Sequence, residues 1–244
     1  MKTLYGLDFG VVYDFTGKTT LNFDLGAKIS KYEKAALFDT EEYDAKIAWL
    51  YAIGSKTKVG PYVAAERVFV DRNASQTGLS LGVDADYSIG AKTTLKGFAG
   101  IERRTFSGPG NTQTNPELEL AVEYELTGKT DLSASIYSRV TASYSEPGLA
   151  YDARGGALTL KHAATDKLKL TGGLTYEHND YFSVDGTAFP AQNADYYTFR
   201  LGADLDISDD LAASATLSYL LNESERASSE SNGTTFAVGL EKKF

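Results

Sequence analysis

The sequence predicts an all-β fold, a single transmembrane antiparallel up-and-down β-barrel that covers residues 1–244. Three observations predict it: apolar and polar residues alternate along about a dozen segments, a short turn motif recurs, and short turns alternate with long polar connections. Because successive side chains of a strand leave opposite faces, this alternation indicates strands with one apolar and one polar face.

The alternating segments are long enough to cross a bilayer as tilted strands. In residues 118–126, Leu118, Leu120 and Val122 share one face, whereas the other carries three glutamates, at positions 119, 123 and 125. The same pattern fills residues 21–29, 43–53, 79–87 and 197–207. A spanning strand needs about 9–11 residues, and no apolar run approaches the roughly 18 residues of a membrane helix. The segments therefore read as membrane strands.

A repeated motif marks the short turns. Thr-Gly-Lys-Thr stands at residues 16–19 and 127–130, with variants at 54–57 and 90–93 and weaker copies at 164–167 and 208–210. Each copy predicts a tight hairpin in which Gly or Asp supplies unusual backbone angles. Longer polar connections lie between them, at residues 31–42, 71–76, 105–115, 145–151, 179–194 and 222–233. Short periplasmic turns and long outer loops are typical of transmembrane barrels.

Six short turns and six long connections give thirteen countable strands. The first, residues 4–15, and the last run in the same direction, so direct closure of the barrel would be parallel. Bacterial single-chain barrels have even strand numbers. We favour about fourteen strands, with one N-terminal strand absent from this sequence. Closure with thirteen strands, or a miscount near residues 155–156 that gives twelve or fourteen, are the alternatives.

Composition agrees with a barrel and excludes several classes of site. The mean hydropathy is −0.27, which alternation produces by diluting apolar residues, and many of the 16 Tyr and 12 Phe fall near strand ends, as in aromatic girdles. A soluble β-sandwich also alternates, but its strands are usually shorter. The net charge of −9 argues against nucleic-acid binding. No Gly-rich phosphate loop, Cys cluster or metal-ligand spacing occurs, so we expect neither metal nor cofactor.

The C-terminal strand carries the one resemblance to a known family. Its outward residues are Phe236, Val238, Leu240 and the terminal Phe244. This strand resembles the C-terminal strand of bacterial outer-membrane β-barrels. The resemblance implies that these four residues form the signal read by the barrel-assembly machinery. It also implies a location in the outer membrane, among lipid and lipopolysaccharide, with short turns periplasmic and long loops extracellular.

The polar faces of the strands would line the lumen of such a barrel. Acidic side chains outnumber basic ones there, which predicts weak cation selectivity. The candidate pore-lining residues are Asp24, Lys46, Asp84, Asp86, Glu119, Glu123, Arg139, Arg200, Asp204 and Asp206. The alternative for each of these charges is that it only keeps the interior hydrated and paired.

Signals for catalysis are few. The only histidines are His162 and His178, and parity places both on the outward face. Some outer-membrane barrels are rim phospholipases or proteases, and His178-Asn179-Asp180 is similar to a rim Asp–His pair. We interpret both residues as aromatic-belt histidines and expect no enzyme. The aromatic-rich connection at residues 179–194 has three open roles: a pore constriction, a partner-binding loop or a self-packed surface loop.

The function that the sequence predicts is that of an outer-membrane porin, a passive diffusion channel for small hydrophilic solutes. The alternative is a structural or adhesive barrel that binds envelope partners through its loops or N-terminal region. A homo-oligomer is compatible with either function.

Overall fold

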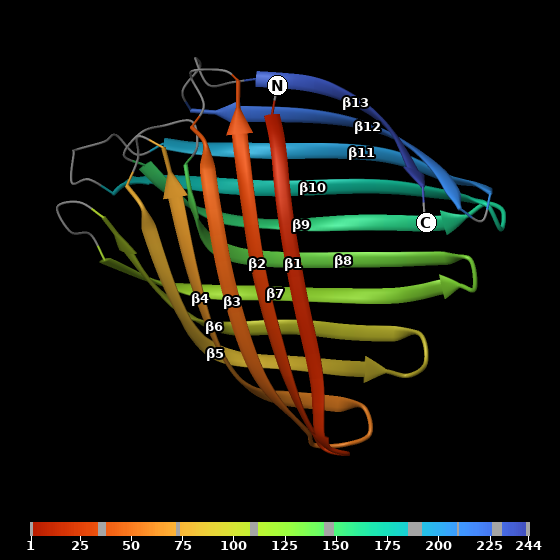
Figure 1. Ribbon diagram of the computed structural model, residues 1–244, viewed down its shortest axis with the longest axis horizontal. Helices are drawn as coiled ribbons and strands as arrows, with labels where there is room; N and C mark the ends of the chain where they lie inside the picture. The colour runs from red at the N-terminus through yellow and green to blue at the C-terminus, as the bar shows by residue number, and fades with distance from the viewer. Residues whose placement is uncertain are drawn as a thin grey trace.

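One continuous antiparallel sheet of thirteen strands makes up the described part of the chain (Figure 1). The computed structural model describes residues 2–33, 38–71, 74–107, 112–143, 149–184, 192–208, 210–225 and 231–242. Each strand pairs with its neighbours in the chain, from β1 to β13. The strands are β1 (Lys2–Thr16), β2 (Thr19–Tyr32), β3 (Thr40–Ala52), β4 (Thr57–Val70), β5 (Gln76–Ile89), β6 (Thr93–Phe106), β7 (Thr112–Thr127), β8 (Thr130–Ala142), β9 (Leu149–Ala163), β10 (Leu168–Ser183), β11 (Gln192–Ser208), β12 (Leu211–Ser224) and β13 (Ser231–Lys242).

The thirteen strands counted in the sequence are confirmed. Gly155 and Gly156 lie inside the uninterrupted strand β9. The sheet is strongly curved, and β1–β4 turn away from the direction of the later strands (Figure 1). Short turns follow the lower and right-hand edge of this view, and the strand ends that lead into long connections gather at the upper left. Within the described residues, β1 and β13 each pair with one neighbour only.

Threonine hydroxyls, more than glycine angles, shape the repeated turns. The backbone N–H of Lys18 donates to Thr16 Oγ1 at 3.2 Å, and Lys129 and Lys167 repeat this contact with a threonine two residues earlier. Among the described glycines, only Gly90 has a positive φ, of 75°. Among the described glycines, the expectation of unusual backbone angles therefore holds at one turn, and a threonine side-chain hydrogen bond supports three of the others.

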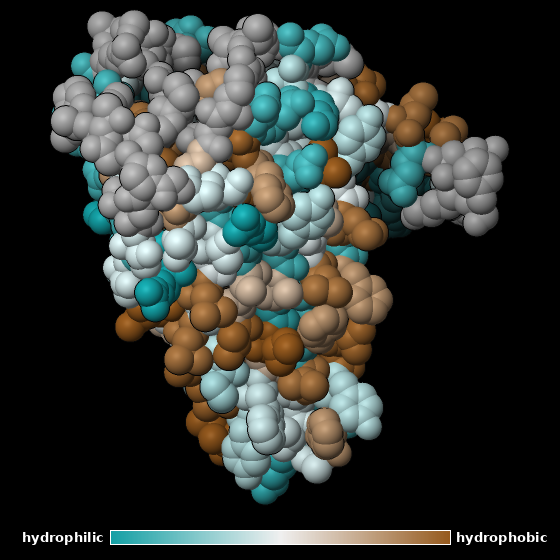
Figure 2. Space-filling view, turned by 60° about the vertical axis from the view of Figure 1, so that its left-hand side comes forward, coloured by the Kyte–Doolittle hydropathy of each residue, from teal (hydrophilic) through white to brown (hydrophobic). Residues whose placement is uncertain are grey.

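The apolar face of the sheet is exposed, as the barrel prediction requires. Leu81 and Trp49 keep 63% and 61% of their surface accessible. The exposed apolar set runs from the first strand to the last and includes Leu25, Ile136, Leu170, Leu205, Leu217, Phe236, Val238 and Leu240. Figure 2 shows apolar side chains gathered across the lower half of the molecule and hydrophilic ones in its upper part. Bilayer lipid is the solvent that suits such a surface.

Exposed aromatic residues flank this face at both ends of the strands. Tyr51, Tyr87 and Tyr124 lie near the short turns. Tyr43 stacks edge-on against Phe69, and Tyr176 lies against Tyr197 at 5.2 Å, near the long connections. This placement is that of two aromatic girdles. No α-helix long and apolar enough to span a bilayer occurs in the part of the chain that the structure describes.

The opposite face holds the buried residues and follows the sequence parity. Ala48, Leu50 and Tyr62 form a small cluster there, packed against Ala64 and Phe98. The Tyr62 ring lies over Gly82, its cross-strand partner on β5, and packs edge-on against Phe98 at 5.4 Å. An aromatic ring over a strand glycine fills the gap that the missing side chain leaves.

The predicted connection at residues 179–194 is shorter than expected. β10 continues to Ser183 and β11 begins at Gln192, with pairing as far as Tyr181 and Gln192. The Tyr181 and Tyr196 hydroxyls lie 3.3 Å apart, and the Tyr181 ring packs on Tyr151. These contacts extend the hairpin, because aromatic residues favour pleated, half-buried strands. Residues 185–191 of the predicted loop lie outside the described residues.

Candidate pore lining

All ten predicted pore-lining residues lie on the face opposite the exposed apolar set. Asp24 lies directly across from Lys46 in the β2–β3 ladder, and Asp86 lies across from Lys96 in the β5–β6 ladder. Glu119 on β7 faces Tyr137 on β8. The three members on β11 are Arg200, Asp204 and Asp206, which alternate with the apolar Leu201 and Leu205.

A cavity of about 550 Å³ occupies this face toward the long-connection end of the strands. Three of the ten residues line it: Lys46, Glu119 and Arg139. Among the described residues, six carboxylates and four basic side chains contribute to the lining. The cavity lining does not include the other seven predicted residues, Asp24, Asp84, Asp86, Glu123, Arg200, Asp204 and Asp206. Most of these stand nearer the short turns.

The Lys46 ammonium contacts side chains from three other strands. Its ammonium nitrogen lies 2.6 Å from the Asp84 carboxylate, two strands away on β5. It also lies 4.3 Å from the Phe98 ring centre and 4.8 Å from that of Tyr62. Asp24, although directly opposite in the ladder, instead reaches toward Gly10 on β1, where an added Cβ would lie 3.2 Å from its Oδ1.

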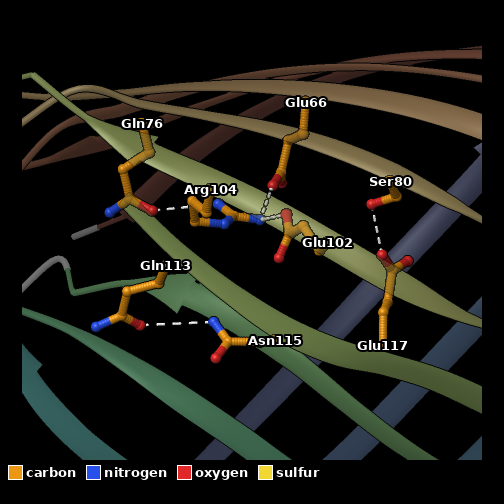
Figure 3. Close-up of polar contacts among 8 residues, drawn as sticks. All are labelled: Glu66, Gln76, Ser80, Glu102, Arg104, Gln113, Asn115 and Glu117. Atoms are coloured by element: carbon orange, nitrogen blue, oxygen red, sulfur yellow. Dashed lines mark hydrogen bonds and ion pairs between the residues drawn. The ribbon is translucent and has the colours of Figure 1, made fainter. Parts of the chain in front are cut away.

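A buried polar cluster on β4–β6 centres on Arg104 (Figure 3). The Arg104 guanidinium pairs with Glu102 at 2.5 Å and with Glu66, and donates to Gln76 Oε1 at 3.1 Å. Arg104, Glu102 and Gln76 are all buried. A buried arginine needs such partners, since an unpaired buried charge is costly. The Arg104 Nε and Gln76 Nε2 atoms nevertheless have no hydrogen-bond partner among the described residues.

Further carboxylates next to this cluster carry excess negative charge. The Ser80 hydroxyl donates to Glu117 at 2.5 Å, which holds the carboxylate on β7 toward β5 (Figure 3). Asp44 lies above Gly26, where a side chain would collide with its carboxylate. Arg139 stacks on the Tyr137 ring at 4.7 Å. The arrangement offers oxygen acceptors and aromatic faces, both of which favour cations.

Parity places Glu66, Glu102 and Arg104 on the luminal face, but the ten candidate residues do not include them, and they do not include Tyr62 or Tyr137 either. The inner position of the two tyrosines was not predicted, because aromatic residues in a barrel sequence are expected in the girdles at the membrane interfaces. The signal that could have found them is their register with glycines, Gly82 for Tyr62 and Gly155 for Tyr137.

His178 is not an isolated belt histidine. Its Nδ1 lies 2.9 Å from Asp195 and its Nε2 lies 3.1 Å from Asp180. Tyr176 also donates to Asp195, at 2.7 Å. The sequence reading missed Asp195 because it lies on β11, although it is the direct cross-strand partner of His178. Both ring nitrogens face carboxylates, so the imidazole is engaged on both sides.

Within the described ranges, no group of three or more His, Cys, Asp or Glu side chains has a geometry that could hold a metal ion.

Comparison with known proteins identifies the fold. No family model matches the chain, and neither does any curated protein. A loop-deletion variant of OmpT, an outer-membrane protein of Vibrio cholerae, is 14% identical, with 99% of this chain and 96% of that chain covered and a TM-score of 0.51. The FrpB iron transporter of Neisseria meningitidis (14% identity, 100% and 48% covered, TM-score 0.58) and the copper transporter OprC (12% identity, 98% and 49% covered, TM-score 0.61) are also similar.

This chain thus spans nearly all of OmpT and about half the length of FrpB and OprC. At such identities the similarity concerns the fold. All three are outer-membrane β-barrels, and the outer membrane is the location that the fold indicates. The chain therefore has the fold of the bacterial outer-membrane β-barrels, as its C-terminal strand predicts.

Proposed function

We propose that this chain forms a water-filled, weakly cation-selective channel for passive diffusion of small hydrophilic solutes across the outer membrane. One observation carries the proposal: a cavity rich in charged side chains lies on the polar face of a strongly curved sheet whose other face is exposed and apolar. Charged groups in that position need water, and a curved sheet with lipid on its outer side encloses that water as a lumen.

The balance of charge sets the direction of selectivity. Six carboxylates against four basic side chains line the cavity among the described residues. Asp86, Asp204 and Asp206 add negative charge nearer the short turns. A low-dielectric wall focuses this field and enriches cations in the lumen. Screening limits the effect, since the Debye length is about 8 Å at physiological salt.

Asp84 contributes less to this field than its position suggests. Its carboxylate is paired with Lys46 at 2.6 Å, whereas Asp86, Asp204 and Asp206 have no ion pair among the described residues. Replacing Asp84 would release a lysine rather than simply remove a negative charge. The selectivity test therefore uses the other three.

Reversal potentials across a salt gradient in planar bilayers test the proposal. The refolded protein should conduct, with a reversal potential that indicates cation preference and grows in dilute salt. The triple variant Asp86→Asn, Asp204→Asn, Asp206→Asn should lose most of that preference while still conducting. If the folded protein does not conduct, the proposed channel is wrong. If the wild type prefers anions, or if the triple variant keeps the cation preference, the proposed role of these three carboxylates in selectivity is wrong.

A further inference from the structure

The side chain of Lys46 occupies a compartment that is built around an ammonium group. Three elements form it: the Asp84 carboxylate from β5, the Tyr62 ring from β4 and the Phe98 ring from β6. The carboxylate pairs with the ammonium at 2.6 Å, and the ring faces attract its charge. Only the four-carbon stem of Lys46 connects this ammonium to β3.

The aromatic walls of the compartment also have contacts that do not involve Lys46. The Tyr62 side chain is 1% exposed, lies over Gly82 and packs edge-on against Phe98. Phe98 lies between Asp84 and Glu119 in the ladder, so its position is set by two neighbouring strands. The aromatic walls are therefore fixed by contacts to the sheet and to each other.

The compartment also adjoins the space through which solutes would pass. Lys46 and Phe98 line the cavity of about 550 Å³, together with the small residues Ala64 and Ser80. Lys46 itself is 27% exposed and Asp84 17%. A partly exposed lysine can swing out toward the cavity, because its stem is flexible and its charge is readily hydrated.

We propose that Tyr62, Asp84 and Phe98 form a binding site for primary alkylammonium groups of solutes in the lumen, with Lys46 as its built-in occupant. This inference rests on the proposed channel and names a solute class for it. A solute with a primary amine displaces the Lys46 ammonium, takes its place against Asp84 and the two rings, and leaves when Lys46 returns. Lys46 thereby keeps the affinity low, which lets the solute leave.

Titration calorimetry with n-butylammonium on the refolded protein in micelles tests the site. The Lys46→Ala variant should bind n-butylammonium at least tenfold more tightly than the wild type, because the internal competitor is gone. Adding Asp84→Asn to this variant should reverse the gain at least tenfold. Lys46→Ser serves as a second variant if Lys46→Ala does not fold, as judged by its heat-dependent gel migration.

Two controls separate the compartment from a general negative field. Lys28→Ala removes another cavity-lining lysine, one paired with Glu42 at 3.0 Å, and should give no gain in butylammonium affinity. Tetramethylammonium, which has no N–H to donate to Asp84, should bind the Lys46→Ala variant at least tenfold more weakly than n-butylammonium. Equal affinities for the two cations, or an equal gain in the Lys28→Ala variant, would overturn the proposal.

The outcome does not depend on conductance. Folded protein that does not conduct but shows the predicted binding would contradict the proposed channel and support the alkylammonium site. Protein that conducts, but whose wild type and Lys46→Ala variant bind n-butylammonium equally, would support the channel and contradict the site.

Discussion

The ring of Tyr62 fills the space over Gly82: a Cβ added to Gly82 would lie 2.7 Å from Tyr62 Cε1. Tyr137 bears the same relation to Gly155, where an added Cβ would lie 2.7 Å from the Tyr137 hydroxyl oxygen. Both tyrosines thus lie flat along the inner face over a cross-strand glycine. They differ in one respect, since Tyr137 donates to Glu177 at 2.6 Å, whereas the buried Tyr62 hydroxyl has no hydrogen-bond partner within the described part of the chain.

This difference predicts opposite results for the same substitution. Tyr137→Phe should lower the free energy of unfolding by about 1.5–3 kcal/mol, the usual worth of a hydrogen bond to a charged group. Tyr62→Phe should leave that free energy unchanged or raise it slightly, because it removes an unsatisfied buried hydroxyl. Urea unfolding in lipid vesicles measures both. A larger loss for Tyr62→Phe than for Tyr137→Phe would contradict the assigned contacts.

The Arg104 cluster should be sensitive to loss of its cation. Arg104→Met leaves the buried Glu102 without its partner, which should cost about 3–5 kcal/mol of unfolding free energy. The double variant Arg104→Met, Glu102→Gln should be more stable than the single one, because it no longer buries an unpaired charge. The same unfolding assay decides, and a double variant less stable than Arg104→Met would show that the pair is not coupled as described.

A charged substitution on the apolar face should lower the free energy of unfolding most at the middle of the bilayer and least near its surfaces. Leu81→Arg, at the middle of β5, should cost about 2–4 kcal/mol, and Ile89→Arg, at the end of the same strand, about 0–1 kcal/mol. Both residues are exposed, so packing differs little between them. Comparison of unfolding in vesicles tests the gradient, and equal small effects at both sites would indicate an apolar face that is not in lipid.

The C-terminal strand should matter more for assembly than for stability. Phe236, Val238 and Leu240 are among the most exposed apolar residues of the structure, whereas Phe244 lies outside the described residues. Phe244→Lys should greatly reduce the amount of folded protein in the outer membrane of cells, and should change the stability of refolded protein by less than about 1 kcal/mol, as expected of a strand-end substitution. Normal assembly in cells would remove the proposed role as a signal for the assembly machinery.

Patterns with period two could be predicted from the sequence because parity alone fixes them. The thirteen strands, the outward set with Leu81 and Leu205, and the inward parity of Asp84 and Asp204 all follow from it. Parity predicts the face on which a side chain lies, but not which other side chain of that face it contacts. Lys46 therefore bonds Asp84 rather than its direct neighbour Asp24, and His178 bonds Asp195 as well as Asp180. Such contacts depend on side-chain length, neighbouring glycines and aromatic rings, which only the folded sheet brings together.

Water accessibility of adjacent residues on β11 tests most directly the claim that one face of this sheet meets water and the other lipid. The chain has no cysteine, so Asp204→Cys and Leu205→Cys each introduce a single thiol, one on each face. In protein refolded into vesicles, a charged, membrane-impermeant thiol reagent should modify Asp204→Cys at least tenfold faster than Leu205→Cys. Similar rates at the two positions, or faster modification of Leu205→Cys, would contradict the account.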